Sequence, residues 1–191
     1  GRLLEPDEGV VHIDAPEAVA ALTLYRDLIR KHRVAPPRPS PSNDYEDQMR
    51  RFGAGEVAMI VNGPWATSAL LASPAFAADP RQLGVAPFPR GADGKPAAPM
   101  SGHGYVVSRC AKDPRAAWAL ARALARRDAQ LQFARKNALL PALASLYDAP
   151  AVRRNRFVKG FRRALRASRA RPQHPAIARI FDDFNPAVQA A

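Results

Sequence analysis

The sequence has little cysteine and no long apolar run. Its single cysteine, Cys110, excludes an internal disulfide and a cysteine-rich metal site, so we expect this thiol to serve packing. No stretch approaches the roughly 18 apolar residues that a membrane-spanning helix requires. The opening residues, GRLLEPDEGV, also lack a basic segment followed by an apolar one, so we expect no targeting signal among them.

The short motifs of common enzyme classes are missing as well. The sequence contains no P-loop, no GxGxxG, no GxSxG and no HExxH. Asp182 and Asp183 are adjacent, so a helix would place them on different faces and not as a converging acid–base pair. Ser101 and His103 lie too close along the chain to face one another as nucleophile and base. We therefore expect neither catalysis nor a cofactor or metal site.

Acidic residues are few relative to basic ones. The chain has 29 Lys and Arg against 17 Asp and Glu, which gives a formal net charge of +12. The cations concentrate between Arg153 and Arg171, where Phe157, Phe161 and Leu165 recur at helical spacing. This pattern indicates a helix with one buried stripe and a solvated basic face. A nucleic-acid-binding module is the alternative, but no recognition-helix, zinc-finger or aromatic RNP-like pattern accompanies the charge, so we expect no nucleic-acid partner.

What is present indicates a globular α/β chain. With 191 residues and 47% hydrophobic residues, the chain can bury a core. A helix is predicted from the Asp14 cap and Pro16 to near Val34. Another is predicted from Asp44 to Phe52, with Gly53 at the left-handed position after it.

The stretch Phe52–Ala66, FGAGEVAMIVNGPWA, is predicted to organise the rest. Glu56–Val61 is a short apolar run that is typical of a buried strand. Asn62-Gly63 then predicts a turn, and Pro64 predicts the first position of a helix. Trp65 follows the carboxyl end of that strand, where ligands gather in open α/β sheets. The alternative is that Trp65 packs in the core, as most aromatic residues do.

Further elements are predicted from patterning and caps. An edge strand is expected at Leu83–Phe88 and another strand at Tyr105–Ser108. A helix is expected from Asp113-Pro114, with Trp118 in the core. We expect a helix over about Asp128–Lys136 that ends with Asn137 in a left-handed conformation, the basic helix from Asp148-Ala149-Pro150, and a last helix from near Ala176.

The order Phe, Gly, acidic residue, Ala-Met, apolar pair and Asn-Gly-Pro-Trp resembles a known signature. It is similar to that of the maltose-binding-protein-like family of extracellular solute-binding proteins of bacterial ABC importers. Later segments resemble the family in the same order: GVAPFPRGADGKP, SGHGYVVS, a helix pair around Trp118, and NALLPALASLYDAP. The resemblance implies an α/β, periplasmic-binding-protein-like two-lobed fold of class II type, incomplete at the N-terminus and at the C-terminus.

The resemblance also implies how the chain divides into lobes. Residues 1–101 would belong to a first, C-lobe-like part, and residues 104–149 to a second, N-lobe-like part. Residues 150–191 would return to the first lobe. The crossover at 102–105 would act as a hinge, with Ser101, Gly102 and Gly104 as its residues.

By the same resemblance, the chain is expected to be the substrate-binding component of an ABC sugar importer, not an enzyme. It would capture a maltose-, maltodextrin- or trehalose-like sugar in the periplasm or outside the cell and deliver it to a membrane permease. Trp65 would stack on the sugar beside Gly63, with Phe181 and His103 as further ligand-binding residues. A nucleic-acid-binding module and a glycoside-active enzyme are the alternatives. Because one wall of the site would be incomplete, we expect millimolar affinity or weaker for this chain alone.

Overall fold

The computed structural model describes residues 4–5, 10–36, 44–89, 98–171, 174 and 177–190. The chain forms two compact units, Gly1–Asp47 with Arg171–Ala191, and Gln48–Ala170. Among the described residues, no helix is long and apolar enough to cross a membrane.

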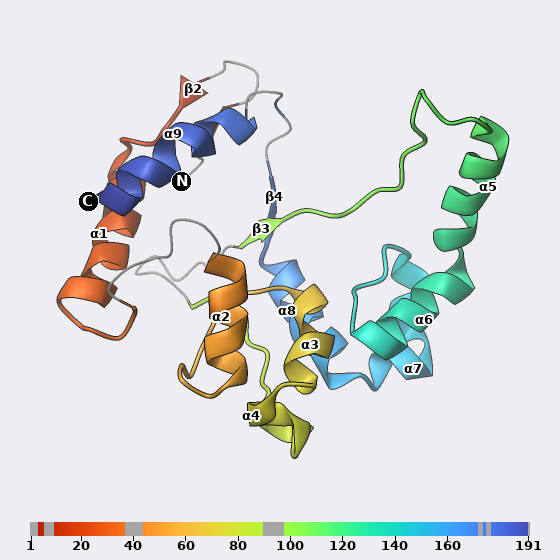
Figure 1. The fold of residues 1–191 in the computed structure, drawn as a ribbon, viewed down its shortest axis with the longest axis horizontal. Coiled ribbons are helices and arrows are strands. Elements are labelled where there is room, and N and C mark those ends of the chain that lie inside the picture. The colour runs from red at the N-terminus through yellow and green to blue at the C-terminus, as the bar shows by residue number, and fades with distance from the viewer. Residues whose placement is uncertain are drawn as a thin grey trace. The chain divides into compact units, whose positions relative to one another are not determined.

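The first unit contains a small hairpin and two helices (Figure 1). Strands β1 (Leu4–Glu5) and β2 (Val10–Val11) pair antiparallel, and the helices are α1 (Pro16–Arg30) and α9 (Ile177–Ala190). Pro16 occupies the start of α1 as predicted, but the N-cap is Ala15, and no side chain caps the helix. The predicted cap by Asp14 is therefore wrong, because Asp14 lies one residue too far back to reach the free N–H groups of the first turn.

Helix α2 (Asp44–Gly53) leads into the second unit and confirms a predicted helix. Its end differs from the prediction. Gly55, with φ +78°, takes the left-handed position, and the N–H of Glu56 donates to the carbonyl of Arg51 at 2.9 Å. This hydrogen bond and the positive φ of Gly55 form a Schellman end of the helix. The left-handed residue is therefore Gly55, two positions later than the predicted Gly53. Gly53 itself stays helical, close to the side chain of Ser73.

The second unit is mainly helical (Figure 1). Strands β3 (Pro99–Met100) and β4 (Arg169–Ala170) pair in parallel, with Pro99 opposite Arg169. The helical elements, in order, are η1 (Pro64–Ala66), α3 (Thr67–Leu71), α4 (Pro74–Ala77), η2 (Pro80–Gln82), α5 (Pro114–Leu124), α6 (Arg127–Asn137), η3 (Ala144–Asp148), α7 (Pro150–Arg153) and α8 (Arg156–Arg166).

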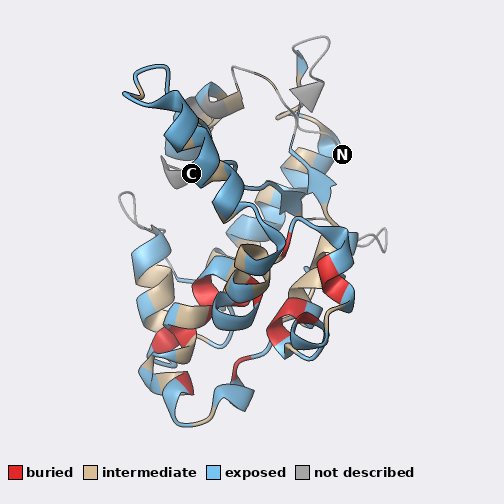
Figure 2. Cartoon of the chain, turned by 90° about the vertical axis from the view of Figure 1, so that its right-hand side faces the viewer, coloured by how far each residue is buried: buried red, intermediate tan, exposed pale blue. Residues whose placement is uncertain are grey.

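The core of this unit lies where α3, α4, α6, α7 and α8 meet (Figure 2). The largest fully buried side chains among the described residues are Leu146, Val152 and Val158, and the two valines belong to this core. Burial of each such side chain stabilises the fold by about 1.5–3 kcal/mol. Residues from all three predicted lobe segments contribute to the core: Ala66, Leu70, Phe76, Leu83, Ala134, Ala138, Tyr147, Val152, Phe157 and Val158. The predicted lobe boundaries describe a whole two-lobed receptor and stay a prediction.

The basic helix predicted from Pro150 is divided into α7 and α8. Asn155 caps α8, because its Oδ1 accepts the N–H groups of Phe157 at 3.0 Å and Val158 at 3.3 Å. Its Nδ2 donates to the carbonyl of Ala134 at 3.2 Å, which ties the cap to α6. Farther along α8, Gly160 lets Val85 approach closely, since a Cβ there would lie 2.8 Å from the Cβ of Val85.

Three predicted strands are wrong within the described residues. No described residue forms a strand partner for any of these three segments, which are Glu56–Val61, Leu83–Phe88 and Tyr105–Ser108. Met59 is 86% exposed, although its segment was predicted to be a buried strand, and Val106 is 89% exposed. A strand requires a neighbour for its backbone groups, and an apolar run alone does not supply one.

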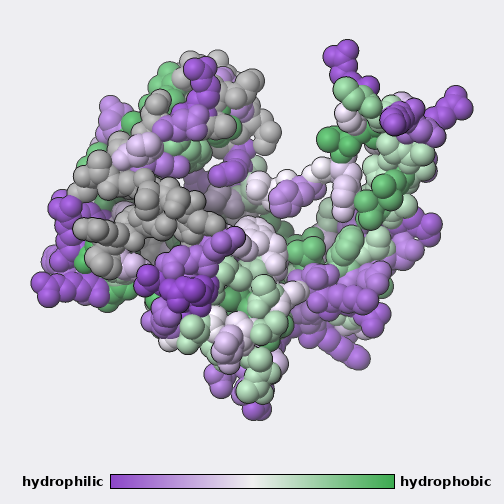
Figure 3. Space-filling model, in the orientation of Figure 1, coloured by the Kyte–Doolittle hydropathy of each residue, from purple (hydrophilic) through white to green (hydrophobic). Residues whose placement is uncertain are grey.

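Helix α5 starts as predicted but does not pack as predicted. The carboxylate of Asp113 accepts the N–H of Ala116 at 3.0 Å, which confirms the cap. However, no residue of α5 is buried, and apolar and charged side chains lie next to each other over it (Figure 3). Trp118 is exposed, so its prediction as a core residue is wrong. Cys110 is also exposed, which corrects its predicted packing role.

The end of α6 differs from the prediction by one residue. Ala138 takes the left-handed conformation, with φ +57°, while Asn137 remains helical. Ala138 is buried in the core, and the side chain of Asn137 donates to Ser68 Oγ at 3.4 Å. Packing and this hydrogen bond therefore place Ala138 in the left-handed conformation, although asparagine adopts that conformation more readily than alanine.

Candidate functional site

The turn before Trp65 is fixed by the side chain of Asn62. Its Oδ1 accepts the N–H of Gly63 at 2.8 Å, and its Nδ2 lies 3.3 Å from both Gln48 Oε1 and Met49 Sδ. Asn62 therefore joins the turn to α2. Gly63 is extended, with φ −117° and ψ 179°, so the positive φ that the sequence suggested is not used.

Gly63 is required for another reason, which is the position of the Trp65 ring. A Cβ at Gly63 would lie 2.1, 2.2 and 2.6 Å from three carbons of that ring. Such distances are far below van der Waals contact, so any larger residue here would displace the indole. The structure thus brings Gly63 and Trp65 together, with the ring resting on the backbone of the turn.

The backbone of Trp65 is anchored from the following turn. Pro64 starts η1 as predicted, and α3 continues directly from it. Ala66, Thr67 and Leu70 are all buried, so the residues after Trp65 are held in the core. Trp65 itself remains 57% exposed. An aromatic side chain with a fixed backbone and a free surface loses little conformational entropy when a ligand stacks on it.

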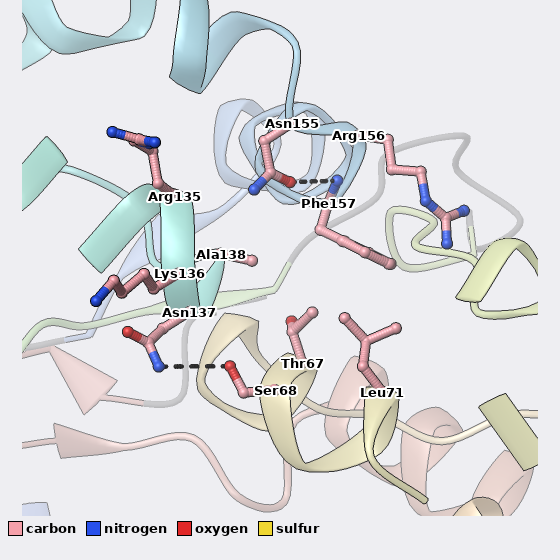
Figure 4. A pocket seen from close by; sticks show the side chains of 10 residues that line it. All are labelled: Thr67, Ser68, Leu71, Arg135, Lys136, Asn137, Ala138, Asn155, Arg156 and Phe157. Atoms are coloured by element: carbon pink, nitrogen blue, oxygen red, sulfur yellow. Dashed lines mark hydrogen bonds between the residues drawn. The ribbon is translucent and has the colours of Figure 1, made fainter. Parts of the chain in front are cut away.

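A pocket of about 230 Å³ is lined in part by residues of α3 (Figure 4). Thr67, Ser68 and Leu71 face residues from the end of α6 and the start of α8. Arg135, Lys136 and Arg156 extend away from the space between Thr67 and Phe157. The full lining is Thr67, Ser68, Leu71, Arg135, Lys136, Asn137, Ala138, Asn155, Arg156 and Phe157. Trp65 does not line this pocket, and the sequence offered no motif that could have predicted it.

Arg156 is held beside this pocket by several contacts. Its guanidinium lies 4.2 Å from the centre of the Phe157 ring and donates to the carbonyl of Pro80. A second nitrogen lies 3.5 Å from the carbonyl of Arg81. Since these contacts occupy the guanidinium, Arg156 stabilises the packing of α8 and does not offer a free cation to the pocket.

Hydrogen bonding lowers the pKa of Asp79, and burial raises the pKa of Tyr147. The Arg81 side chain donates a hydrogen bond to the carboxylate of Asp79, and this is the main cause of the lowered pKa of Asp79. The backbone N–H of Arg81 donates to the same carboxylate and is the second cause. Burial raises the pKa of Tyr147, and the nearby charge of Arg162, 4.5 Å from the ring centre, opposes this shift. Neither group belongs to the Trp65 turn. In the described ranges, no three His, Cys, Asp or Glu side chains gather to hold a metal ion.

The other predicted site residues belong to segments other than the Trp65 turn. Phe181 is half-buried in α9, which belongs to the first compact unit. His103 is exposed, and so are the predicted hinge residues Ser101, Gly102 and Gly104. A Cβ at either glycine would meet nothing within 4 Å. The ligand-binding roles of Phe181 and His103, and the hinge, stay predictions.

Comparison with known proteins shows similar sequences. Residues 3–158 match the sequence model of a family described as "Bacterial extracellular solute-binding protein". A relative in Deinococcus radiodurans, named "Probable ABC transporter-binding protein", is 31% identical over 147 residues. The match covers 77% of this chain and 34% of that protein.

Solved structures share the fold. The GacH receptor of Streptomyces glaucescens, solved unliganded and with acarbose, has a TM-score of 0.87 at 29% identity, over 99% of this chain and 47% of that one. Maltose-bound MalE3 of T. maritima has a TM-score of 0.81 at 31% identity, over 100% of this chain and 49% of that one. For the maltose-maltodextrin binding protein of Alicyclobacillus acidocaldarius, the TM-score is 0.72 at 26% identity, over 95% and 49%.

These matches confirm the predicted fold class, the two-lobed fold of periplasmic sugar-binding proteins. The chain spans about half the length of the solved receptors and about a third of the Deinococcus relative.

Proposed function

Because this chain belongs to the bacterial extracellular solute-binding protein family, we propose that it takes part in capturing a sugar for an ABC importer. The proposed ligand is a mono- or oligosaccharide of the maltose, maltodextrin or trehalose type. One similar receptor is named as a maltose-maltodextrin binding protein, one was solved with maltose bound and one with acarbose, which supports this ligand class. The partner would be a membrane permease, and the location the periplasm or the cell exterior.

One observation carries the proposal. The Trp65 ring rests on Gly63 and remains 57% exposed, while its backbone is anchored by buried residues on one side and by Asn62 on the other. Sugars present apolar C–H faces that stack on such a ring, while their hydroxyl groups require polar partners. In this proposal, Trp65 is the stacking residue and Gly63 holds the ring in place.

Phe181 and His103 complete the proposal as weaker ligand contacts. A phenylalanine offers a smaller face than a tryptophan, so Phe181 would contribute less stacking. Enclosure would come from closure of the two lobes around residues Ser101 to Gly104, and the closed form would be recognised by the permease. The lobes would be residues 1–101 with 150–191, and residues 104–149.

Affinity for this chain alone is proposed to be weak. An aromatic stack contributes about 0.5–1.5 kcal/mol beyond area burial, whereas a micromolar complex requires about 8 kcal/mol. Binding pockets enclose most of a small ligand, but the described pocket beside α3 is small and does not include Trp65. We therefore expect a millimolar dissociation constant or weaker.

Titration calorimetry with maltose, trehalose and acarbose tests the proposal. We expect Trp65→Ala to abolish the heat of binding of the preferred sugar. Trp118→Ala is the matched control, because Trp118 has the same exposed fraction, 57%, but lies on a helix without buried residues. It should leave the binding heat unchanged.

Two results would contradict the proposal. If the two variants lose the same amount of binding, the Trp65 turn is not the site. A micromolar constant for the chain alone would show that the binding surface lies elsewhere. Turnover of aryl glycosides would favour the enzyme alternative, which the family of binding proteins does not support.

A further inference from the structure

The basic charge of this chain is concentrated in one segment. From Ala149 to Phe181 the sequence contains nine arginines and one lysine but no aspartate or glutamate. The rest of the chain contains both basic and acidic residues. A segment without any acidic residue keeps its positive potential, because no neighbour along the chain neutralises it.

Helix α8 arranges part of this charge on one face. Lys159, Arg163 and Arg166 are exposed, and their spacing of four and three residues places them on the same side of the helix. We call these three residues the basic stripe. It extends over about 10 Å along the helix axis, at 1.5 Å per residue. The opposite face holds Phe157 and Val158, which are buried and fix the orientation of the helix.

The basic stripe has no partner in the part of the chain that the structure describes. The described salt bridges join Arg26, Arg50, Arg81 and Arg126 to carboxylates, and none includes a residue of the stripe. The neighbouring Arg162 differs, because it lies over the Tyr147 ring, and Arg156 is held by Phe157 and Pro80. No described residue therefore competes with an external anion for the stripe.

The segment that carries the stripe has no exposed apolar anchor of its own. None of the large apolar side chains that are exposed among the described residues lies between Pro150 and Arg171. Protein–protein interfaces derive most of their affinity from buried aromatic and aliphatic anchors, which are missing here. Arginine binds phosphate through two parallel hydrogen bonds, so phosphate groups match this surface better than a protein partner does.

We propose that the basic stripe of α8 docks the protein on the phosphate headgroups of an anionic membrane surface. The family works with transporters, which places such a surface beside the protein. Each Lys or Arg close to an anionic bilayer strengthens binding about fivefold. This contact would concentrate the protein near the membrane without inserting any side chain into the hydrocarbon. The inference is independent of the sugar and of Trp65.

Vesicle sedimentation tests this inference with the whole chain. Phosphatidylglycerol–phosphatidylcholine vesicles are compared with pure phosphatidylcholine vesicles at low and at physiological salt. We expect binding only to the anionic vesicles, and weaker binding as salt rises, because salt screens charges over about 8 Å at 0.15 M. The variant Lys159→Gln/Arg163→Gln/Arg166→Gln should bind about a hundredfold more weakly, at about fivefold per residue.

A matched control removes the same charges elsewhere. Arg109, Lys112 and Arg115 are exposed, and they are also two arginines and one lysine. Arg109→Gln/Lys112→Gln/Arg115→Gln should reduce binding less than tenfold. Circular dichroism confirms that both variants are folded.

Three results would overturn the inference. Equal losses in the two triple variants would show that only net charge matters. Absence of binding to the anionic vesicles at low salt would remove the membrane surface as a partner. Tighter binding to duplex DNA than to vesicles at the same salt, lost in the stripe variant, would assign the stripe to nucleic acid instead.

Discussion

The two tryptophans of this chain have the same exposure but different surroundings. Trp65 and Trp118 are both 57% exposed. The Trp65 ring rests on Gly63, and buried Ala66, Thr67 and Leu70 follow it. Trp118 lies in the middle of α5, a helix in which no residue is buried.

This difference shows that exposure alone does not indicate a binding residue. A side chain that is exposed and also held in place can bind a ligand without a large loss of entropy. A side chain that is exposed on a poorly packed helix must be ordered first. We therefore expect the core beneath Trp65 to be rigid and α5 to be flexible, and variants in the two regions can test this difference.

The largest expected effect is on the core beneath Trp65. Leu70 is 5% exposed, whereas Leu120 on α5 is 61% exposed. Leu70→Ala should reduce the free energy of unfolding by about 2–5 kcal/mol, because it leaves a cavity in the core. Leu120→Ala should change it by less than about 0.5 kcal/mol. Urea denaturation followed by circular dichroism measures both, and similar losses would mean that the two regions are equally packed.

The next effect concerns the close approach of α8 to Val85. In Gly160→Ala, the new Cβ would lie 2.8 Å from the Cβ of Val85 and 3.3 Å from its carbonyl oxygen. Overpacking costs about 1–3 kcal/mol, and alanine returns roughly 1 kcal/mol in helix propensity, so we expect a net loss of up to about 2 kcal/mol. Gly84→Ala is the control, since a Cβ there meets nothing within 4 Å. A gain in stability for Gly160→Ala, measured by thermal unfolding, would show that α8 does not pack tightly.

These packing effects also mark the limit of sequence reasoning. The helix starts at Pro64 and Pro114 were predicted correctly, because proline at the first helical position, and at Pro114 also the Asp113 cap, act locally. The strand predicted at Glu56–Val61 was wrong, because a strand depends on a partner that its own residues do not encode.

The site shows the same limit. The exposure of Trp65 agrees with its place after an Asn-Gly-Pro turn, but the contact between its ring and Gly63 could not be predicted from sequence. The division of the basic helix was also missed. Asn155 was the available signal, since asparagine is a preferred N-cap, but the arginines on both sides of it suggested a continuous helix.

Smaller effects are expected at the two helix caps. Asn155 caps α8 and also binds the carbonyl of Ala134, while Asp113 caps the exposed α5. Asn155→Ala should reduce the free energy of global unfolding by about 1–2 kcal/mol. Asp113→Ala should mainly increase hydrogen exchange within α5, because local unfolding there does not disturb the core. Hydrogen exchange measured by mass spectrometry separates the two cases, and global loss of protection in Asp113→Ala would contradict this division.

The smallest effect is expected from the Asp79–Arg81 ion pair beside the core. Arg81 hydrogen-bonds the carboxylate of Asp79 at 2.8 Å and lowers its pKa. Since the pKa is lowered in the folded state, the pair stabilises the fold above the ordinary pKa of the carboxyl. This contribution is lost as pH falls through the lowered value.

NMR titration of the Asp79 carboxyl measures that pKa directly. In Arg81→Gln the pKa should rise toward its ordinary value, while stability at neutral pH should change little, because the pair is at the surface. An unchanged pKa in this variant would show that Arg81 is not the cause of the shift.

Fluorescence of single-tryptophan variants tests most directly whether the anchored tryptophan is the ligand-binding one. Trp118→Phe keeps only Trp65, and Trp65→Phe keeps only Trp118. With maltose or acarbose up to about 100 mM, well above a millimolar dissociation constant, emission of the Trp118→Phe variant should change and saturate. Emission of the Trp65→Phe variant should change no more with the sugar than it does with the same concentration of mannitol, which serves as the control solute. A saturable change in the Trp65→Phe variant, or none in either, would contradict the assignment of the site to Trp65.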